Sequence, residues 1–104
     1  MALLRIREAA AGGDWILAPV GDLDMASAQK LDARLVAAAR EHREGRLIVD
    51  LAGIDFMDSA GLRVLLTAAR SAGSDGDRLR LRRARPSVQR VFEVSGTESL
   101  LPFE

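Results

Sequence analysis

The chain has 104 residues, of which 48% are hydrophobic and 29% charged, as expected for one globular domain spanning residues 1–104. Its 15 basic and 15 acidic residues give a formal net charge of zero, so no overall field attracts it to nucleic acid or anionic lipid. The absence of cysteine excludes disulfides, and no apolar run is long enough for a membrane span, which together favour a cytoplasmic protein.

The first half of the chain predicts a hairpin, a helix and a buried strand. Residues 3–7 alternate apolar and charged side chains, which is typical of a strand with one wet face. A hairpin turn at 9–14 leads into a second strand at 15–20. Residues 25–43 have helical periodicity. The apolar run 47–51 is typical of a strand buried on both faces of a parallel sheet.

The second half continues this alternation. A helix is expected from about residue 60 to 72, a loop at 71–77 and a strand at 78–84. A third helix begins at Pro86, and the apolar tail 99–104 is expected to dock as a last short element. The order predicts an α/β domain with a small mixed sheet, an N-terminal hairpin and the first two long helices on one face.

Ser59 is the first candidate functional residue. It lies at or near a helix N-terminus, where free N–H groups and the helix dipole favour an anion. It could be a helix cap or a phosphoacceptor. Serine catalysis is not favoured, because the only histidine, His42, is expected at the far end of the first helix. Residues 57–61 also lack the first glycine of a nucleophile elbow.

Acidic residues precede both of the first two helices. Asp24 and Asp58 follow apolar strands, at the edge where ligands and partners engage an open α/β sheet, and each could also cap a helix. The spacing of Asp22, Asp24, Asp55 and Asp58 matches no compact calcium or magnesium loop, so no metal is predicted. The arginines at 78–85 have no interleaved aromatic residues, so a solvated strand face is favoured over a nucleic-acid site.

Three other residues surround the serine. Phe56 and Met57 lie in a segment expected to turn at the surface, where they are either the edge of the core or contacts for a partner. Gly61 allows another backbone to approach the helix closely.

Three segments together resemble the STAS domain, and more narrowly the bacterial anti-sigma factor antagonists: GDLD at 21–24, LIVDL at 47–51 and MDSAGL at 57–62. The resemblance covers nearly the whole chain and implies a binding module, not an enzyme. In that family, the serine matching Ser59 is phosphorylated by a serine kinase that is also the anti-sigma factor. The unphosphorylated antagonist binds that kinase and so releases the sigma factor, and a serine phosphatase resets the switch.

This resemblance predicts a kinase and a phosphatase as partners of a monomer or weak dimer, with no cofactor, nucleic acid or membrane. A scaffold subunit of a stress-signalling or lipid-transport assembly is an alternative with the same fold. An enzyme using Asp58 and Ser59 on a phosphorylated substrate, and loose nucleotide binding near Ser59, also stay open. The partner-binding residues expected around the phosphorylation site Ser59 are Asp22, Asp24, Ser27, Phe56, Met57, Asp58, Ala60, Gly61 and Arg63.

Overall fold

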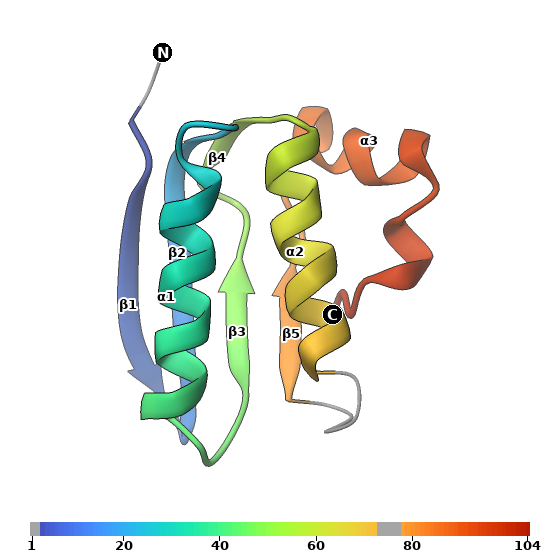
Figure 1. Ribbon diagram of the computed structural model, residues 1–104. Coiled ribbons are helices and arrows are strands. Elements are labelled where there is room, and N and C mark those ends of the chain that lie inside the picture. The colour runs from blue at the N-terminus through green and yellow to red at the C-terminus, as the bar shows by residue number, and fades with distance from the viewer. Residues whose placement is uncertain (1–2, 73–77) are drawn as a thin grey trace.

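Figure 1 shows the computed structural model, which describes residues 3–72 and 78–104. Within these ranges a mixed β-sheet is covered by helices, as the sequence predicts. The elements are β1 (Arg5–Ala11), β2 (Asp14–Leu23), α1 (Ala28–Glu41), β3 (Leu47–Asp50), β4 (Ile54–Met57), α2 (Ser59–Ala72), β5 (Leu79–Arg82), α3 (Pro86–Ser95) and the short 3-10 helix Glu98–Leu100.

The sheet is built around β2. Strand β1 is antiparallel to β2, and the order continues through β3 to β5 with parallel pairing. Strand β4 pairs with the far end of β2, so β3 and β4 follow one another along β2. Pro19, which has no N–H to donate, lies between the two stretches of pairing.

Several predicted boundaries are wrong. The hairpin loop is only Gly12 and Gly13, because Ala11 already pairs with Asp14 and residues 9–11 belong to β1. Strand β2 does not end at residue 20 but continues to Leu23. Of the predicted loop at 71–77, residues 71 and 72 belong to α2, and the remainder lies outside the described residues.

Strand β4 was not predicted. Its residues were expected to turn at the surface, yet they pair in parallel with residues 21–23 of β2. Tertiary pairing therefore overrides the weak local preference of both segments for extended structure. The consequence is that β2 and β4 end side by side, immediately before α1 and α2.

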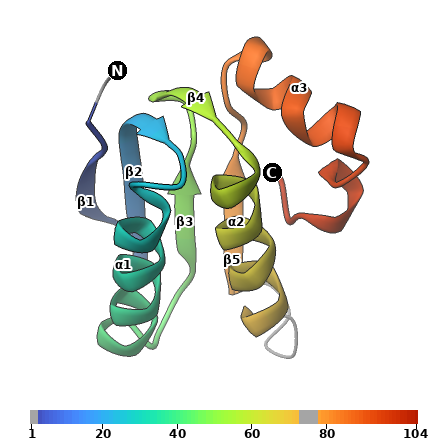
Figure 2. The ribbon, with the colours of Figure 1, turned by 45° about the horizontal axis from the view of Figure 1, so that its top comes forward.

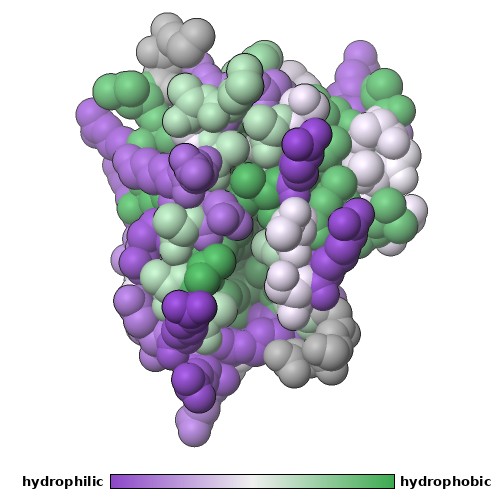
Figure 3. Space-filling view, viewed as in Figure 1, coloured by the Kyte–Doolittle hydropathy of each residue, from purple (hydrophilic) through white to green (hydrophobic). Residues whose placement is uncertain are grey.

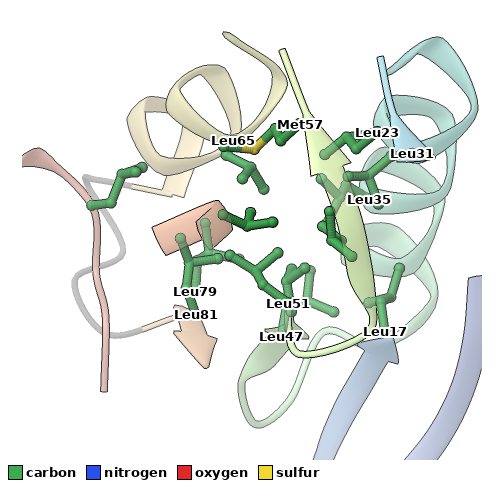
Figure 4. Close-up of a cluster of buried hydrophobic side chains, with 14 of the residues drawn as sticks. Leu17, Leu23, Leu31, Leu35, Leu47, Leu51, Met57, Leu65, Leu79 and Leu81 are labelled. Carbon is green, nitrogen blue, oxygen red and sulfur yellow. The ribbon is translucent and has the colours of Figure 1, made fainter. Parts of the chain in front are cut away.

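Helices α1 and α2 pack side by side on one face of the sheet, as right-handed crossovers require (Figures 1 and 2). Leucines from both helices and from the sheet point toward one another in the core (Figure 4). The prediction that residues 47–51 form a strand buried on both faces is confirmed, since Leu47, Ile48 and Val49 are all buried. This core holds the N-terminal ends of α1 and α2 in fixed positions.

The predicted third helix and docked tail are confirmed. Helix α3 starts at Pro86 and ends before Gly96, which adopts a positive φ of 74°. Phe103 then bridges to Leu81 of β5, and its ring meets that of Phe92 edge to face at 5.1 Å.

A polar cluster joins the hairpin to α1 at the end of β2 remote from Ser59. The Glu8 carboxylate accepts hydrogen bonds from the guanidinium of Arg34, at 2.6 and 2.7 Å, and from the indole N–H of Trp15 at 2.9 Å. The ring of His42 stacks on Trp15 with centroids 3.8 Å apart. The hydrogen bond from Arg34, supported by that from Trp15, lowers the pKa of Glu8 despite its partial burial.

Glu8→Gln is expected to destabilise the protein at neutral pH and to have a smaller effect in acid. Because the pKa of Glu8 is lower in the folded state, its stabilising contribution is complete above the ordinary carboxyl range and is lost as pH falls through the folded-state value. Arg34 is 35% exposed, so screening limits the cost to about 1 kcal/mol. Urea unfolding at pH 7 and at about pH 3 tests this. The exposed Glu93→Gln is the control, and an equal loss for Glu8→Gln at both pH values contradicts the prediction.

Candidate functional site

The turn between β2 and α1 meets the junction between β4 and α2 at one edge of the molecule (Figure 2). We call this region, residues 22–27 and 56–63, the Ser59 edge. The backbone N–H of Asp58 donates to the Leu23 carbonyl at 3.2 Å. In return, one carboxylate oxygen of Asp58 accepts a hydrogen bond from the Met25 N–H at 3.1 Å. Two loops that are 33 residues apart in sequence are thereby held together.

Asp58, not Ser59, caps α2. Its other carboxylate oxygen accepts hydrogen bonds from the N–H groups of Ala60 at 2.9 Å and Gly61 at 3.2 Å. These groups have no partner within the helix, so the cap satisfies two of its free donors. The interpretation of Ser59 as the cap is therefore wrong, and the alternative given for Asp58 is confirmed.

Asp24 organises the other loop in a similar way. Its carboxylate accepts hydrogen bonds from the N–H groups of Ala26 at 3.0 Å and Ser27 at 3.1 Å. The Ser27 hydroxyl donates to the Asp22 carbonyl at 2.8 Å. This turn delays the start of α1 to Ala28, so the predicted start at residue 25 is wrong.

These acidic residues are arranged around backbone N–H groups. Within residues 3–72 and 78–104, no group of three or more His, Cys, Asp or Glu side chains is placed to hold a metal ion. In the same ranges, no helix has the length and apolar character that a bilayer crossing requires.

Ser59 is the first residue of α2, and its side chain is exposed. Its hydroxyl forms no hydrogen bond with any described residue, because Asp58 already satisfies the neighbouring N–H groups. Arg63 lies one turn further along the helix and is also exposed. The hydroxyl can therefore be modified without breaking an existing contact of the fold.

Two residues predicted to contact a partner have other positions. Met57 is only 4% exposed and belongs to the core, so its side chain supports the edge from beneath. Gly61 is buried because α2 passes very close to β2. The alternative that Met57 belongs to the edge of the core is confirmed, and so is the close approach of another backbone at Gly61. Phe56, in contrast, is 52% exposed and remains a candidate contact.

Met25 is an exposed residue of this edge that was not singled out as a partner contact, although it lies within the 22–27 loop expected at the partner surface. Its side chain is 81% exposed, while its N–H is held by Asp58. An apolar residue beside Asp24 in a polar loop was the available signal, but it was assigned to the helix instead. Methionine adapts its shape to different surfaces, which suits a residue at a contact surface.

Gly61→Ala is expected to destabilise the protein by about 1–2 kcal/mol. An added Cβ would lie 2.8 Å from the Leu23 carbonyl oxygen and 2.7 Å from the Leu23 side chain. Overpacking costs roughly 1–3 kcal/mol, and the better helix propensity of alanine recovers about 1 kcal/mol at most. Urea unfolding measures the difference, with the exposed Thr67→Ala on the same helix as control. A Gly61→Ala protein as stable as the parent contradicts this account of the close approach.

Comparison with known proteins identifies the family. The family model described as "Mlab, STAS domain" matches residues 6–102, and the chain belongs to the STAS domain family. It is 39% identical over 82 residues to BtrV of Bordetella bronchiseptica, which is named as an anti-sigma factor antagonist. That alignment covers 79% of this chain and 70% of BtrV.

Solved structures confirm the predicted fold. An anti-sigma factor antagonist from Mycobacterium paratuberculosis superposes with a TM-score of 0.85 at 21% identity, covering 97% of this chain and 85% of the other. The anti-sigma factor antagonist SpoIIAA in its unphosphorylated form superposes with a TM-score of 0.75 at 20% identity, covering 98% of this chain and 86% of SpoIIAA. Bacillus SpoIIAA in its phosphorylated form superposes with a TM-score of 0.69 at 20% identity, covering 98% of this chain and 89% of the other. At these identities the similarity shows the fold alone.

Proposed function

We propose that this protein is an anti-sigma factor antagonist that binds an anti-sigma serine kinase through the Ser59 edge and is switched off by phosphorylation of Ser59. In the unphosphorylated form it occupies the kinase, and the sigma factor is released. A serine phosphatase restores the active form. The protein itself acts in the cytoplasm as a binding module and catalyses no reaction.

The observation that carries the proposal is the position of the Ser59 hydroxyl. It is exposed at the first turn of α2 and forms no hydrogen bond with the described residues. Asp58 and the turn around Asp24 fix the surface beside it. Support also comes from the relationship to BtrV and from the existence of a phosphorylated form of SpoIIAA.

The proposed contact surface follows from exposure. Ser59 lies at its centre, with Phe56 and Met25 as apolar contacts and Arg63 as a charged one. Asp22, Asp24, Ser27, Asp58 and Ala60 shape this surface through the backbone. Met57 and Gly61 act from beneath it.

Incubation with the cognate kinase and labelled ATP tests the phosphorylation site. The parent protein is expected to incorporate phosphate, and Ser59→Ala is expected to incorporate none. Ser87→Ala is a matched control, because Ser87 is also exposed in the first turn of a helix, α3. Equal labelling of Ser59→Ala and the parent overturns the assignment. Stable co-purification with a larger assembly, unaffected by Ser59 substitutions, supports the scaffold alternative instead.

A further inference from the structure

A groove separates α1 and α2 toward the ends of these helices that lie away from Ser59. Figure 3 shows a hollow between the two helices with hydrophobic surface inside it. The groove has a volume of about 600 Å³, which is within the range of sites that hold small organic ligands. Apolar residues of both helices and of the starts of β3 and β5 line it: Leu35, Val36, Leu47, Ala68 and Leu79.

Positive charge is concentrated at one end of this groove. Among the described residues, Arg40, Arg43 and Arg78 line it together with a single carboxylate, that of Asp32, although the chain as a whole has no net charge. Arg43 donates only a long hydrogen bond of 3.4 Å to the Arg40 carbonyl. Among the described residues, no carboxylate forms an ion pair with Arg40 or Arg43. Both guanidinium groups are therefore available to an anion.

Arg78 has a different part in the arrangement. Its guanidinium donates hydrogen bonds to the Gly45 carbonyl at 2.8 Å and to the Ala39 carbonyl at 3.0 Å. These bonds hold the last turn of α1 and the chain that follows it against the start of β5. Arg40 thus projects from a helix end that is fixed in place, and Arg43 from the chain directly after it.

The groove is also polarised along its length. Asp32 and Arg40 are eight residues apart on α1, which corresponds to roughly 12 Å along the helix. The acidic end repels an anionic head group, and the basic end attracts it. Between them Val36 is 46% exposed, so apolar surface faces solvent when the groove is empty.

We propose that this groove binds an amphipathic carboxylate, with its hydrocarbon chain against Val36 and the apolar floor and its head group between Arg40 and Arg43. The volume suits a single chain of this kind. Burial of the ligand's hydrocarbon chain supplies most of the affinity, and each buried methylene group raises the affinity roughly fourfold. The two arginines supply the preference for an anion and set the direction in which the ligand lies.

Calorimetric titration of the full chain with dodecanoate tests the proposal, with shifts of amide NMR signals to locate the site. Saturable binding is expected, with shifts in α1 and α2 around Val36 and Ala68. Octanoate is expected to bind at least tenfold more weakly, because fewer methylene groups are buried. Dodecyltrimethylammonium, which has the same chain and the opposite charge, is also expected to bind at least tenfold more weakly.

Two variants distinguish the contribution of the arginines to binding from that of the apolar surface of the groove. The double variant Arg40→Gln/Arg43→Gln is expected to weaken dodecanoate binding about tenfold, and Val36→Asp is expected to abolish it. All three positions are at the surface, and the melting temperature of each variant shows that it folds. Arg90→Gln on α3 is the control and is expected to bind as the parent does. Equal binding of the cationic and anionic probes, or unchanged affinity in both variants, overturns the proposal.

Discussion

Phosphorylation of Ser59 is expected to weaken binding to the partner kinase by about a hundredfold. A phosphoserine carries about −1.5 to −2 charges near neutral pH, and an interface at the Ser59 edge would remove it from water beside Asp58. A hundredfold corresponds to about 2.7 kcal/mol, a modest fraction of the cost of burying such an anion. Calorimetry or surface plasmon resonance with the purified phosphorylated and unphosphorylated forms measures this ratio.

Arg63 is the group that could oppose this effect. It lies four residues after Ser59 on the same helix, so it can pair with a phosphate there. An exposed pair of this kind contributes about 0.3–0.5 kcal/mol, which is too little to offset the loss. Ser59→Asp, with one negative charge, is expected to lose about tenfold, whereas the matched Ser87→Asp binds as the parent does. Tight binding by both the phosphorylated form and Ser59→Asp contradicts the repulsion mechanism.

Asp58→Ala is expected to lower both the stability of the protein and its affinity for the kinase. The substitution removes the cap of α2, worth about 1 kcal/mol, and the hydrogen bond that ties the Met25 loop to that helix. Because the site is partly exposed, the loss of the cap and of this hydrogen bond together is expected to lower the free energy of unfolding by about 2 kcal/mol. This corresponds to a fall of roughly 10 °C in melting temperature. Differential scanning calorimetry and kinase titration give the two readouts.

Asp55→Ala is the control for this prediction. Asp55 is also acidic and lies three residues earlier. Among the described residues its carboxylate forms only an ion pair with Arg85 at 3.0 Å, with both side chains about half exposed. Such pairs contribute less than about 1 kcal/mol. Similar melting temperatures for Asp55→Ala and Asp58→Ala show that the Asp58 carboxylate does not organise the edge as described.

The sequence was sufficient to predict the α/β class, the hairpin, the three main helices and the family. Periodicity carried the predictions of the helices and strands, because an apolar stripe or a buried run indicates an element wherever the rest of the chain lies. The position of Ser59 at or near the start of a helix was predicted from the same periodicity. The family was predicted from the resemblance of the motifs at residues 21–24, 47–51 and 57–62. The short motif containing Ser59 was the strongest indication of function, and the relationship to BtrV agrees with it.

Strand β4 could not be predicted in the same way, since its four residues follow a pattern of buried, exposed, exposed and buried. That pattern lacks the alternation of a strand, and the i, i+3 spacing of its two buried residues is closer to that of a helix. Its partner residues in β2 include Gly21 and Asp22, which are poor strand formers. Without β4, the sequence left open whether Met57 belongs to the core or contacts a partner, and whether Ser59 or Asp58 caps α2.

The position of Trp15, which stacks on His42 at the end of β2 remote from Ser59, has a practical consequence for all of these measurements. Trp15 is the only tryptophan, and eight residues of extended β2 separate it from Leu23, which is roughly 26 Å. Its fluorescence is therefore expected to follow unfolding, and to change little when a partner binds near Ser59. One intrinsic optical signal can thus show that a variant is folded, while a label placed at Phe56 reports binding independently in the same sample.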